Sequence, residues 1–275
     1  LYNRAIQVAY PPGSIFKLVV LLASLEEDEN IEFENFYCPG YEIVNDRITN
    51  CSRIHGHLNL KEAFAQSCNT VFIQLGKRIG AEKIIDMARR LGFGLQIDIG
   101  LAEETEGNLP EENELLGGAI RNIAIGQGSI EVTPLQVSNL LTIIGNKGIR
   151  RQISLVKGIT NNEGFMIKNY FKNKDERLIS RKSSQLVINY MEEVINTGTA
   201  RSIDLTSIGG GGGKTGTAEA VYNEKNTVHG WFAGFYPAKE PKYSVVILIE
   251  NTSKGSITTL PIFKKIALVL AQYLH

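Results

Sequence analysis

The chain has 275 residues, of which 43% are hydrophobic and 21% are charged, an ordinary globular composition with enough apolar residues for a sizeable core. Lysine plus arginine and aspartate plus glutamate both number 29, so no net charge points to a nucleic acid or an acidic surface as partner. No apolar run reaches the roughly 18 residues that a transmembrane helix needs. Because the chain begins with Leu1 and no signal-peptide pattern follows, we expect a fragment or a processed form.

The segment of residues 10–25 predicts a buried helix. Two prolines and a glycine at 11–13 cannot continue a helix, so the helix should begin at Ser14. From there to residue 25 only Lys17 and Ser24 are polar, and a helix that is apolar on all sides is buried. Residues three apart share a face, so Ser14 and Lys17 should lie side by side.

The Ser14-x-x-Lys17 pattern has two interpretations. Serine commonly starts a helix, and about one such pattern arises by chance in a chain of this length; Ser154 and Lys157 form a second one. A buried lysine, however, is rare without a partner or a function, and burial favours the neutral amine. A neutral amine beside a hydroxyl is a base beside a nucleophile, and a helix N-terminus favours developing negative charge.

Three cysteines exclude a disulfide-dense scaffold. Cys38 and Cys51 flank a loop-like segment and could form a disulfide in an oxidising compartment; two unpaired thiols are the equally open alternative. Among the four histidines, neither the pair His55 and His57 nor any other has metal-ligand spacing with cysteine or carboxylate support. We therefore expect no metal and no cofactor.

The middle of the chain is predicted to be mostly helical. Apolar residues at helical spacing predict helices at 60–66, 70–79, 81–91, 134–144 and 184–196. Thr133-Pro-Leu-Gln136 is a capping box with proline at the first helical position. The segments between helices are interpreted as a loop or small hairpin at 30–59, an acidic surface loop at 98–118, and a strand followed by an exposed excursion at 151–182.

The periodicity changes towards the C-terminus. Residues 230–236 and 243–250 predict two strands of an antiparallel hairpin joined at 237–241. Residues 245–249 are apolar on both faces, so both sides of the sheet should be covered. The predicted helix at 260–274 is apolar enough to be one cover.

These elements predict a mixed α/β fold in which an antiparallel β-sheet is flanked by helices and joined to a mostly helical subdomain. No internal repeat or low-complexity linker divides the chain, so we expect one domain over residues 1–275. The helical subdomain should cover about 26–200, and the sheet with the C-terminal helix about 201–275.

Two further polar clusters are candidate sites. Ser67-Cys68-Asn69 is the only Ser-x-Asn of the chain and falls at a predicted break between two helices, where both side chains could enter a cleft. An ordinary helix cap is the alternative.

The second cluster is Lys214-Thr215-Gly216-Thr217, which follows five glycines at 209–213. A phosphate-binding loop would need glycine at position 208, which is Ile208, and would open a helix rather than lead into a hairpin, so nucleotide binding is disfavoured. A strand with a cation and two hydroxyls suits a substrate carboxylate, and Gly216 would let the substrate lie close.

Taken together, Ser14-x-x-Lys17, Ser67-x-Asn69 and Lys214-Thr215-Gly216 are similar to the signature set of penicillin-binding proteins and serine β-lactamases. The resemblance to class B penicillin-binding proteins spans the whole chain. It also includes the stretches Tyr10-Pro-Pro-Gly-Ser14, His55-Gly56, Gly126-Gln-Gly128 with Thr133-Pro-Leu-Gln136, Gly213-Lys-Thr-Gly-Thr217-Ala218 and Trp231-Phe-Ala-Gly234.

The resemblance implies a DD-transpeptidase that cross-links peptidoglycan stem peptides and is acylated by β-lactams. Ser14 would attack the D-Ala-D-Ala carbonyl, and an acceptor amine from a second stem peptide would resolve the acyl-enzyme. Lys17 would be the base for Ser14, and Ser67 would relay the proton to the leaving amine. The backbone N–H groups of Ser14 and Thr217 would form the oxyanion hole.

The same resemblance assigns the substrate-binding residues. Asn69 would hold the donor peptide, whereas Lys214, Thr215, Gly216 and Thr217 would bind its terminal carboxylate. It also implies an extracytoplasmic location on the cell-wall side of the cytoplasmic membrane, with no nucleic acid partner and with membrane contact only through an anchor outside this chain.

Three alternatives stay open. A class A β-lactamase would carry Glu-x-x-Leu-Asn, but Leu58-Asn59 is preceded by His55 at the place of the glutamate, which favours a long-lived acyl-enzyme. A DD-carboxypeptidase would use water in place of the amine. A non-catalytic sensor would bind β-lactam or cell-wall peptide without turnover.

The chain departs from the family pattern in two respects. Family members begin the sheet with two strands upstream of the serine motif, and only about ten residues precede it here, so we expect those strands to be absent. The family strand carries apolar residues where this chain has glycines at 209–213. Because glycine weakens a strand interior, we predict a mobile or distorted start of that strand.

Overall fold

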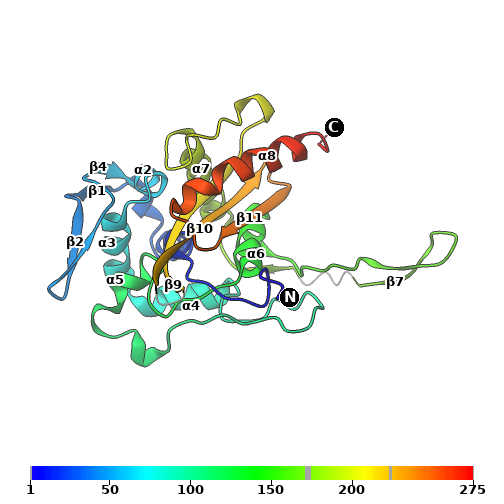
Figure 1. Ribbon diagram of the computed structural model, residues 1–275, viewed down its shortest axis with the longest axis horizontal. Coiled ribbons are helices and arrows are strands. Elements are labelled where there is room, and N and C mark those ends of the chain that lie inside the picture. The colour runs from blue at the N-terminus through cyan, green and yellow to red at the C-terminus, as the bar shows by residue number, and fades with distance from the viewer. Residues whose placement is uncertain (1, 171–174, 223–224, 275) are drawn as a thin grey trace.

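The computed structural model describes residues 2–170, 175–222 and 225–274 (Figure 1). Leu1, on which the expectation of a fragment depends, lies outside these ranges. So do residues 171–174 of the excursion predicted at 151–182 and residues 223–224 of the stretch that leads from Thr217 into the predicted hairpin. Of residues 221, 222 and 225, only the backbone is considered.

The buried helix predicted from the sequence is at the centre of the core. Helix α1 (Lys17–Glu27) has every residue from Lys17 to Leu25 buried, and it contacts helices α3 (Asn69–Ile79), α4 (Ala81–Arg90) and α7 (Arg181–Asn196). The α-helix begins three residues later than predicted. Ser14 instead lies in the tighter 3₁₀ turn η1 (Gly13–Ile15) and caps no helix, which removes the capping interpretation of this serine.

The main sheet has three antiparallel strands within the described residues. Their order is β11 (Tyr243–Ile249), β10 (Lys225–Tyr236) and β9 (Gly212–Tyr222), so β9 lies at an edge. Helix α8 (Leu260–Ala271) packs on one face, where the rings of Phe232 and Phe263 lie 4.5 Å apart. Helices α6 (Pro134–Gly145) and α7 contact the sheet from the other side (Figure 1), so both faces are covered as predicted.

The remaining elements agree with the mixed α/β prediction. The capping box before α6 is present, with proline at the start of the helix. Short helices are α2 (Leu60–Ala65), α5 (Ile120–Ile123), η2 (Glu29–Phe33), η3 (Glu112–Glu114), η4 (Gly117–Ala119), η5 (Thr206–Ile208) and η6 (Gly255–Thr258). Among the described residues, none of the helices combines the length and hydropathy of a membrane-spanning segment.

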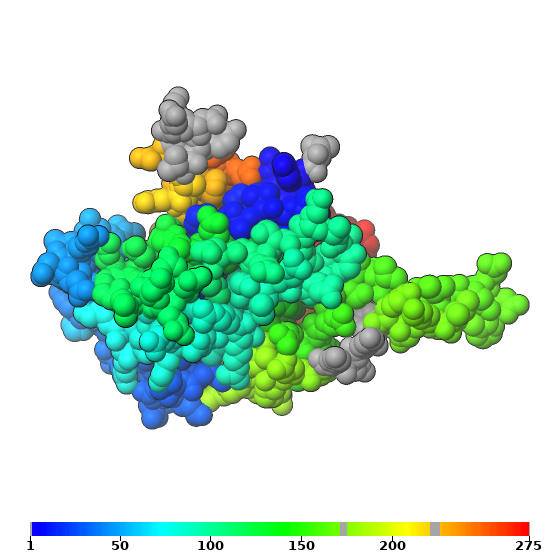
Figure 2. Space-filling view, turned by 90° about the horizontal axis from the view of Figure 1, so that it is seen from below, coloured from blue at the N-terminus to red at the C-terminus, as the bar shows by residue number. Residues whose placement is uncertain are grey.

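In the part of the chain that the structure describes, four pairs of short strands lie outside the main sheet. The predicted hairpin region at 30–59 contains β1 (Asn35–Cys38) paired with β4 (Gly56–Asn59) and, between them, β2 (Tyr41–Val44) paired with β3 (Arg47–Asn50). Strand β5 (Ile149–Arg150) pairs with β8 (Glu176–Arg177). The exposed excursion is confirmed, since β6 (Gly158–Thr160) and β7 (Met166–Asn169) form an arm that projects from the body (Figures 1 and 2).

The glycine run before Lys214 differs from its prediction. Gly209 and Gly210 have φ angles of 92° and 72° and form a turn after η5, in a region that favours glycine. Gly212 and Gly213, however, pair in regular register with β10. The predicted distortion is therefore wrong for these two residues.

Two aromatic rings explain why glycine is needed inside this strand. A Cβ atom on Gly212 would lie 2.2 Å from the ring of Phe235, and one on Gly213 would lie 2.2 Å from the ring of Phe232. Both rings are buried, so neither can move aside at low cost. Because Gly212 and Gly213 have no side chains, the rings of Phe235 and Phe232 on β10 can lie across β9.

Replacing Gly213 by alanine should therefore destabilise the protein. We expect Gly213→Ala to lower the free energy of unfolding by about 1–3 kcal/mol, because the buried ring of Phe232 must shift. Gly118→Ala is the control, since its Cβ would meet atoms no closer than 3.8 Å. Urea unfolding of both variants measures the difference, and equal stabilities would contradict this account of the strand.

Candidate active site

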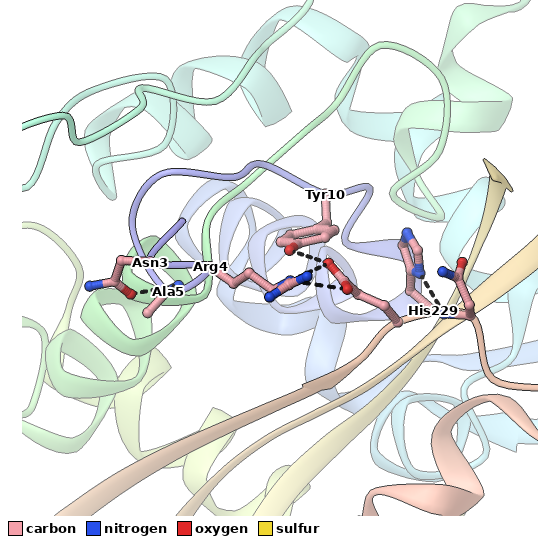
Figure 3. A network of polar contacts seen from close by, with 7 residues as sticks. Asn3, Arg4, Ala5, Tyr10 and His229 are labelled. Carbon is pink, nitrogen blue, oxygen red and sulfur yellow. Dashed lines mark hydrogen bonds and ion pairs between the residues drawn. The ribbon is translucent and has the colours of Figure 1, made fainter. Parts of the chain in front are cut away.

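The segment that leads to Ser14 is fixed to the end of the main sheet (Figure 3). The hydroxyl of Tyr10 donates to Glu250 Oε1 at 2.6 Å, and Arg4 Nε donates to the same carboxylate at 3.1 Å. The rings of Tyr10 and His229 meet edge to face, 5.5 Å apart. The hydrogen bond from Tyr10 holds the pKa of Glu250 below its usual range. The chain therefore enters the serine turn from a fixed point.

The turn that bears Ser14 lies between two other backbone segments. The N–H of Gly13 donates to the carbonyl oxygen of Gly126 at 2.9 Å. A Cβ on Gly126 would lie 2.1 Å from the Gly13 oxygen, and one on Gly13 would lie 2.5 Å from the Thr217 oxygen. Both glycines have positive φ. Close backbone approach at these points brings Ser14 next to β9, and it explains the glycine in the Gly126-Gln-Gly128 motif.

Two buried lysines meet at the hydroxyl of Ser67. Lys17 Nζ donates to the backbone oxygen of Ser67 and to Asn69 Oδ1, both at 2.7 Å, and lies 3.3 Å from Ser67 Oγ. Lys214 Nζ donates to Ser67 Oγ at 2.9 Å and to the Thr215 carbonyl at 3.0 Å. Both lysines are 0% exposed. The fold thus joins side chains from all three predicted clusters.

Burial shifts the protonation of these amines. It lowers the pKa of Lys17 to about 8 and lowers the pKa of Lys214 well below its usual range, the charge of Lys17 adding to the latter effect. Two cations at one hydroxyl also repel each other. Burial therefore favours the neutral form of both amines, and the neutral form of Lys17, which predominates above about pH 8, can act as a base.

Ser14 itself opens onto a cleft of about 620 Å³ that Asn69 and Thr217 also line. Within the described ranges, neither the hydroxyl nor the amide of Ser14 has a hydrogen-bond partner. The predicted contact between Ser14 and Lys17 is not a hydrogen bond here, because the amine is held by Ser67 and Asn69. Catalytic hydrogen bonds often tighten only when substrate is bound, so the assignment of Lys17 as the base stays a prediction.

The residues after Lys214 have different surroundings. Thr217 is exposed beside the cleft, and its Oγ1 accepts from the N–H of Ser256 at 3.2 Å. Thr215 Oγ1 lies 2.6 Å from Thr199 Oγ1. No sequence pattern indicates this partner, because Thr199 follows helix α7 and belongs to none of the motifs.

Gly216 requires a correction. We interpreted it as clearance for a substrate, but a Cβ there would lie 2.8 Å from the Ile15 side chain and 3.1 Å from the Pro12 oxygen. The glycine is also buried. It therefore makes room for the serine turn and not for a ligand in the cleft.

The residues around Ser67 also correct the prediction about metals. All three cysteines are free, so the disulfide between Cys38 and Cys51 is not formed. His55 Nδ1 lies 3.5 Å from the sulfur of each of these two cysteines. The expectation that no histidine has cysteine support is therefore wrong, because the hairpin region folds back on itself and brings distant residues together.

Comparison with known proteins covers almost the whole chain. Residues 1–268 match the family described as penicillin binding protein transpeptidase domain. Peptidoglycan D,D-transpeptidase PbpA of Mycolicibacterium smegmatis is 30% identical over 266 residues, which cover 91% of this chain and 52% of that protein. Stage V sporulation protein D of Bacillus subtilis is 32% identical over 267 residues, covering 94% and 41%. This chain thus spans about half of such relatives or less.

Solved structures show the same fold. Penicillin-binding protein 3 of Mycobacterium tuberculosis, complexed with aztreonam, has a TM-score of 0.88 at 26% identity and covers 99% of this chain and 64% of that one. Penicillin-binding protein A of M. tuberculosis, in a ceftriaxone acyl-enzyme complex, has a TM-score of 0.83 at 27% identity, covering 98% and 62%. These neighbours confirm the mixed α/β fold that the sequence predicted.

The lysine pair makes a prediction for NMR. In protein labelled with ¹³C at lysine Cε, one lysine should titrate near pH 8, and its signal should be absent from Lys17→Met. Lys157→Met, which removes the exposed lysine of the second Ser-x-x-Lys pair, should leave that signal in place. If no lysine of the wild-type protein titrates below about pH 9, burial does not produce a neutral amine here.

Proposed function

Because the chain belongs to the penicillin-binding protein transpeptidase domain family, we propose that it is the catalytic domain of a peptidoglycan D,D-transpeptidase. The observation that carries the proposal is the meeting of Lys17 and Lys214 at the hydroxyl of Ser67, beside the cleft onto which Ser14 opens. A nucleophile, two amines and a relay hydroxyl are the parts that acyl transfer through a serine ester needs.

In the proposed acylation, Ser14 Oγ attacks the carbonyl carbon of the penultimate D-Ala of a donor stem peptide. The hydroxyl proton passes to the neutral amine of Lys17 as the bond from oxygen to carbon forms. The peptide bond then breaks, and the terminal D-Ala leaves as an amine that takes a proton through Ser67 Oγ. Ser67 suits this relay because it lies within hydrogen-bond reach of both lysines.

The negative charge that develops on the carbonyl oxygen must be stabilised by hydrogen-bond donors. The amide of Ser14 has no hydrogen-bond partner among the described residues, and it lies near the N-terminal end of α1, where the helix dipole is positive. The amide of Thr217 would be the second donor, on the edge strand that touches the serine turn. Removing one such donor typically costs about 3 kcal/mol in the transition state.

The donor peptide would lie along the outer edge of β9. Asn69 would hold its backbone, because this side chain lines the cleft while its Oδ1 is fixed by Lys17. The terminal carboxylate would bind at the hydroxyls of Thr215 and Thr217, with the charge of Lys214 nearby. Thr199 would orient Thr215 through the short contact between their hydroxyls.

The fate of the acyl-enzyme follows from where His55 lies. In the sequence pattern Glu-x-x-Leu-Asn of class A β-lactamases, His55 stands where the water-activating glutamate would be, and its Nδ1 faces the sulfurs of Cys38 and Cys51. It is therefore not available to activate water at Ser14. The acyl-enzyme would persist until the amine of a second stem peptide attacks the ester and releases Ser14.

We also propose how the chain is organised and where it acts. As one domain over 1–275, it would form its cleft between the mostly helical part, about 26–200, and the sheet part, about 201–275, since both supply lining residues. Peptidoglycan is assembled outside the cytoplasmic membrane, so the domain would act there, with its anchor outside this chain. β-Lactams would be its inhibitors, as they are ligands of solved relatives.

Labelling with a fluorescent penicillin followed by a chase tests this function. The wild-type protein should carry a covalent label that persists for many minutes, and Ser14→Ala should carry none, because the ester cannot form. Ser154→Ala, which alters the second Ser-x-x-Lys pair, is the matched control and should label fully.

Three outcomes would contradict the proposal. Label retained in Ser14→Ala would assign the nucleophile to another residue. Label lost from the wild-type protein within seconds would indicate a β-lactamase instead. Turnover of a stem-peptide donor that does not require an acceptor amine would indicate a carboxypeptidase.

A further inference from the structure

Four side chains that the proposed reaction does not use gather behind the Ser67 turn. The sulfurs of Cys38, Cys51 and Cys68 and a ring nitrogen of His55 all lie within 4.8 Å of one another. They come from the end of β1, the segment between β3 and β4, and the turn before α3, which lie together in Figure 1. In sequence the spacing is Cys-x₁₂-Cys-x₃-His-x₁₂-Cys.

The distances fit a tetrahedral metal centre. With metal bonds of about 2.3 Å to sulfur and about 2.05 Å to nitrogen, the edges of a tetrahedron are about 3.8 Å between sulfurs and about 3.6 Å from sulfur to nitrogen. Cys51 Sγ lies 3.7 Å from Cys68 Sγ, and His55 Nδ1 lies 3.5 Å from both Cys38 Sγ and Cys51 Sγ. A sulfur–sulfur bond of about 2.05 Å is not approached.

The surroundings also fit metal ligands. Both Cys38 and Cys68 are fully buried. The opposite ring nitrogen of His55, Nε2, is buried without a hydrogen-bond partner in the described residues, so the polar contacts of the ring are with sulfur. The backbone N–H of Asn69 donates to Cys51 Sγ at 3.2 Å, and Thr70 Oγ1 lies 3.3 Å from Cys38 Sγ. Such outer contacts orient and support metal-bound thiolates.

We propose that Cys38, Cys51, His55 and Cys68 bind one zinc ion in a structural site. Three thiolates and one neutral imidazole in tetrahedral arrangement form a ligand set that selects zinc. Four protein ligands fill the coordination shell, so the ion has no open position for water or substrate. Binding displaces the thiol protons into solvent and leaves the site with a net charge of −1.

The position of Cys68 gives this site a purpose, which depends on the proposed function. Cys68 lies between Ser67 and Asn69, and Ser67 has a φ of 54°, a conformation that residues other than glycine rarely adopt. A metal bond to Cys68 would hold this turn. Asn69 is also tied to the segment beside Cys51, through its backbone N–H and through Nδ2, which donates to the Asn50 oxygen. The zinc ion would therefore position two groups: the relay hydroxyl of Ser67, and the side-chain amide of Asn69 that would hold the donor peptide.

Metal analysis of the purified full chain tests the site directly. After incubation with zinc chloride and removal of the excess, elemental analysis should find about one zinc per wild-type chain. Cys51→Ser and His55→Ala should each retain less than about a tenth of that amount. His57→Ala is the matched control: this exposed histidine lies two residues from His55, its ring contacts Tyr37, and its loss should leave zinc at the wild-type level.

Two further measurements use the wild-type protein, so they do not depend on how the variants fold. Cobalt in place of zinc should give the intense visible bands of a tetrahedral thiolate complex. A strong chelator should lower the melting temperature by about 5 °C or more.

Specific results would overturn the zinc site. Wild-type protein with only trace zinc after loading, zinc lost equally from His57→Ala, or a mass that shows a disulfide between Cys51 and Cys68 would each do so. Because none of these readouts uses penicillin, a protein that binds zinc but fails to label would count against the proposed function and not against the site.

Discussion

The hydroxyl of Ser67 is the point on which the site depends, because two buried amines approach it from opposite parts of the chain. Lys17 comes from the central helix and Lys214 from the edge strand, and neither has any exposed surface. Burying an amine without partners is costly, so these contacts are what make the arrangement tolerable. They also fix the position of the α2–α3 break relative to the sheet. The Ser67 hydroxyl thus matters for both stability and catalysis. Burial makes the two lysines need hydrogen-bond partners, and the same burial favours their neutral form.

Other parts of the fold hold Ser67 and the two lysines in position. Glycines at 13 and 126 let the serine turn lie against the backbone at Gly126 and at Thr217. Gly216 leaves room for Ile15 of the same turn. Glycines at 212 and 213 let aromatic rings lie across the strand that carries Lys214. Tyr10 and Glu250 fix the chain just before the turn. Behind the Ser67 turn lie the three cysteines and His55, and zinc bound there would hold the same turn through Cys68.

Much of this could be predicted from the sequence. The apolar run after Ser14, the capping box at Thr133 and the C-terminal hairpin gave the elements, because local periodicity and turn chemistry specify them. The cysteine and histidine cluster could not be derived in that way, since twelve residues separate Cys38 from Cys51 and His55 from Cys68, and these residues meet only through a folded hairpin. Its one local signal was the closeness of Cys51 and His55 in the sequence, with three residues between them. Gly216 was misinterpreted because the sequence does not tell which side of a strand faces a neighbour.

The account rests on an uncharged amine beside Ser67, and the pH dependence of acylation tests that most directly. The second-order rate constant for penicillin acylation of the wild-type protein should rise about tenfold per pH unit below about pH 8 and level off above it, as Lys17 loses its proton. A rate that is flat from about pH 6 to about pH 10, in protein that stays folded throughout, would contradict it.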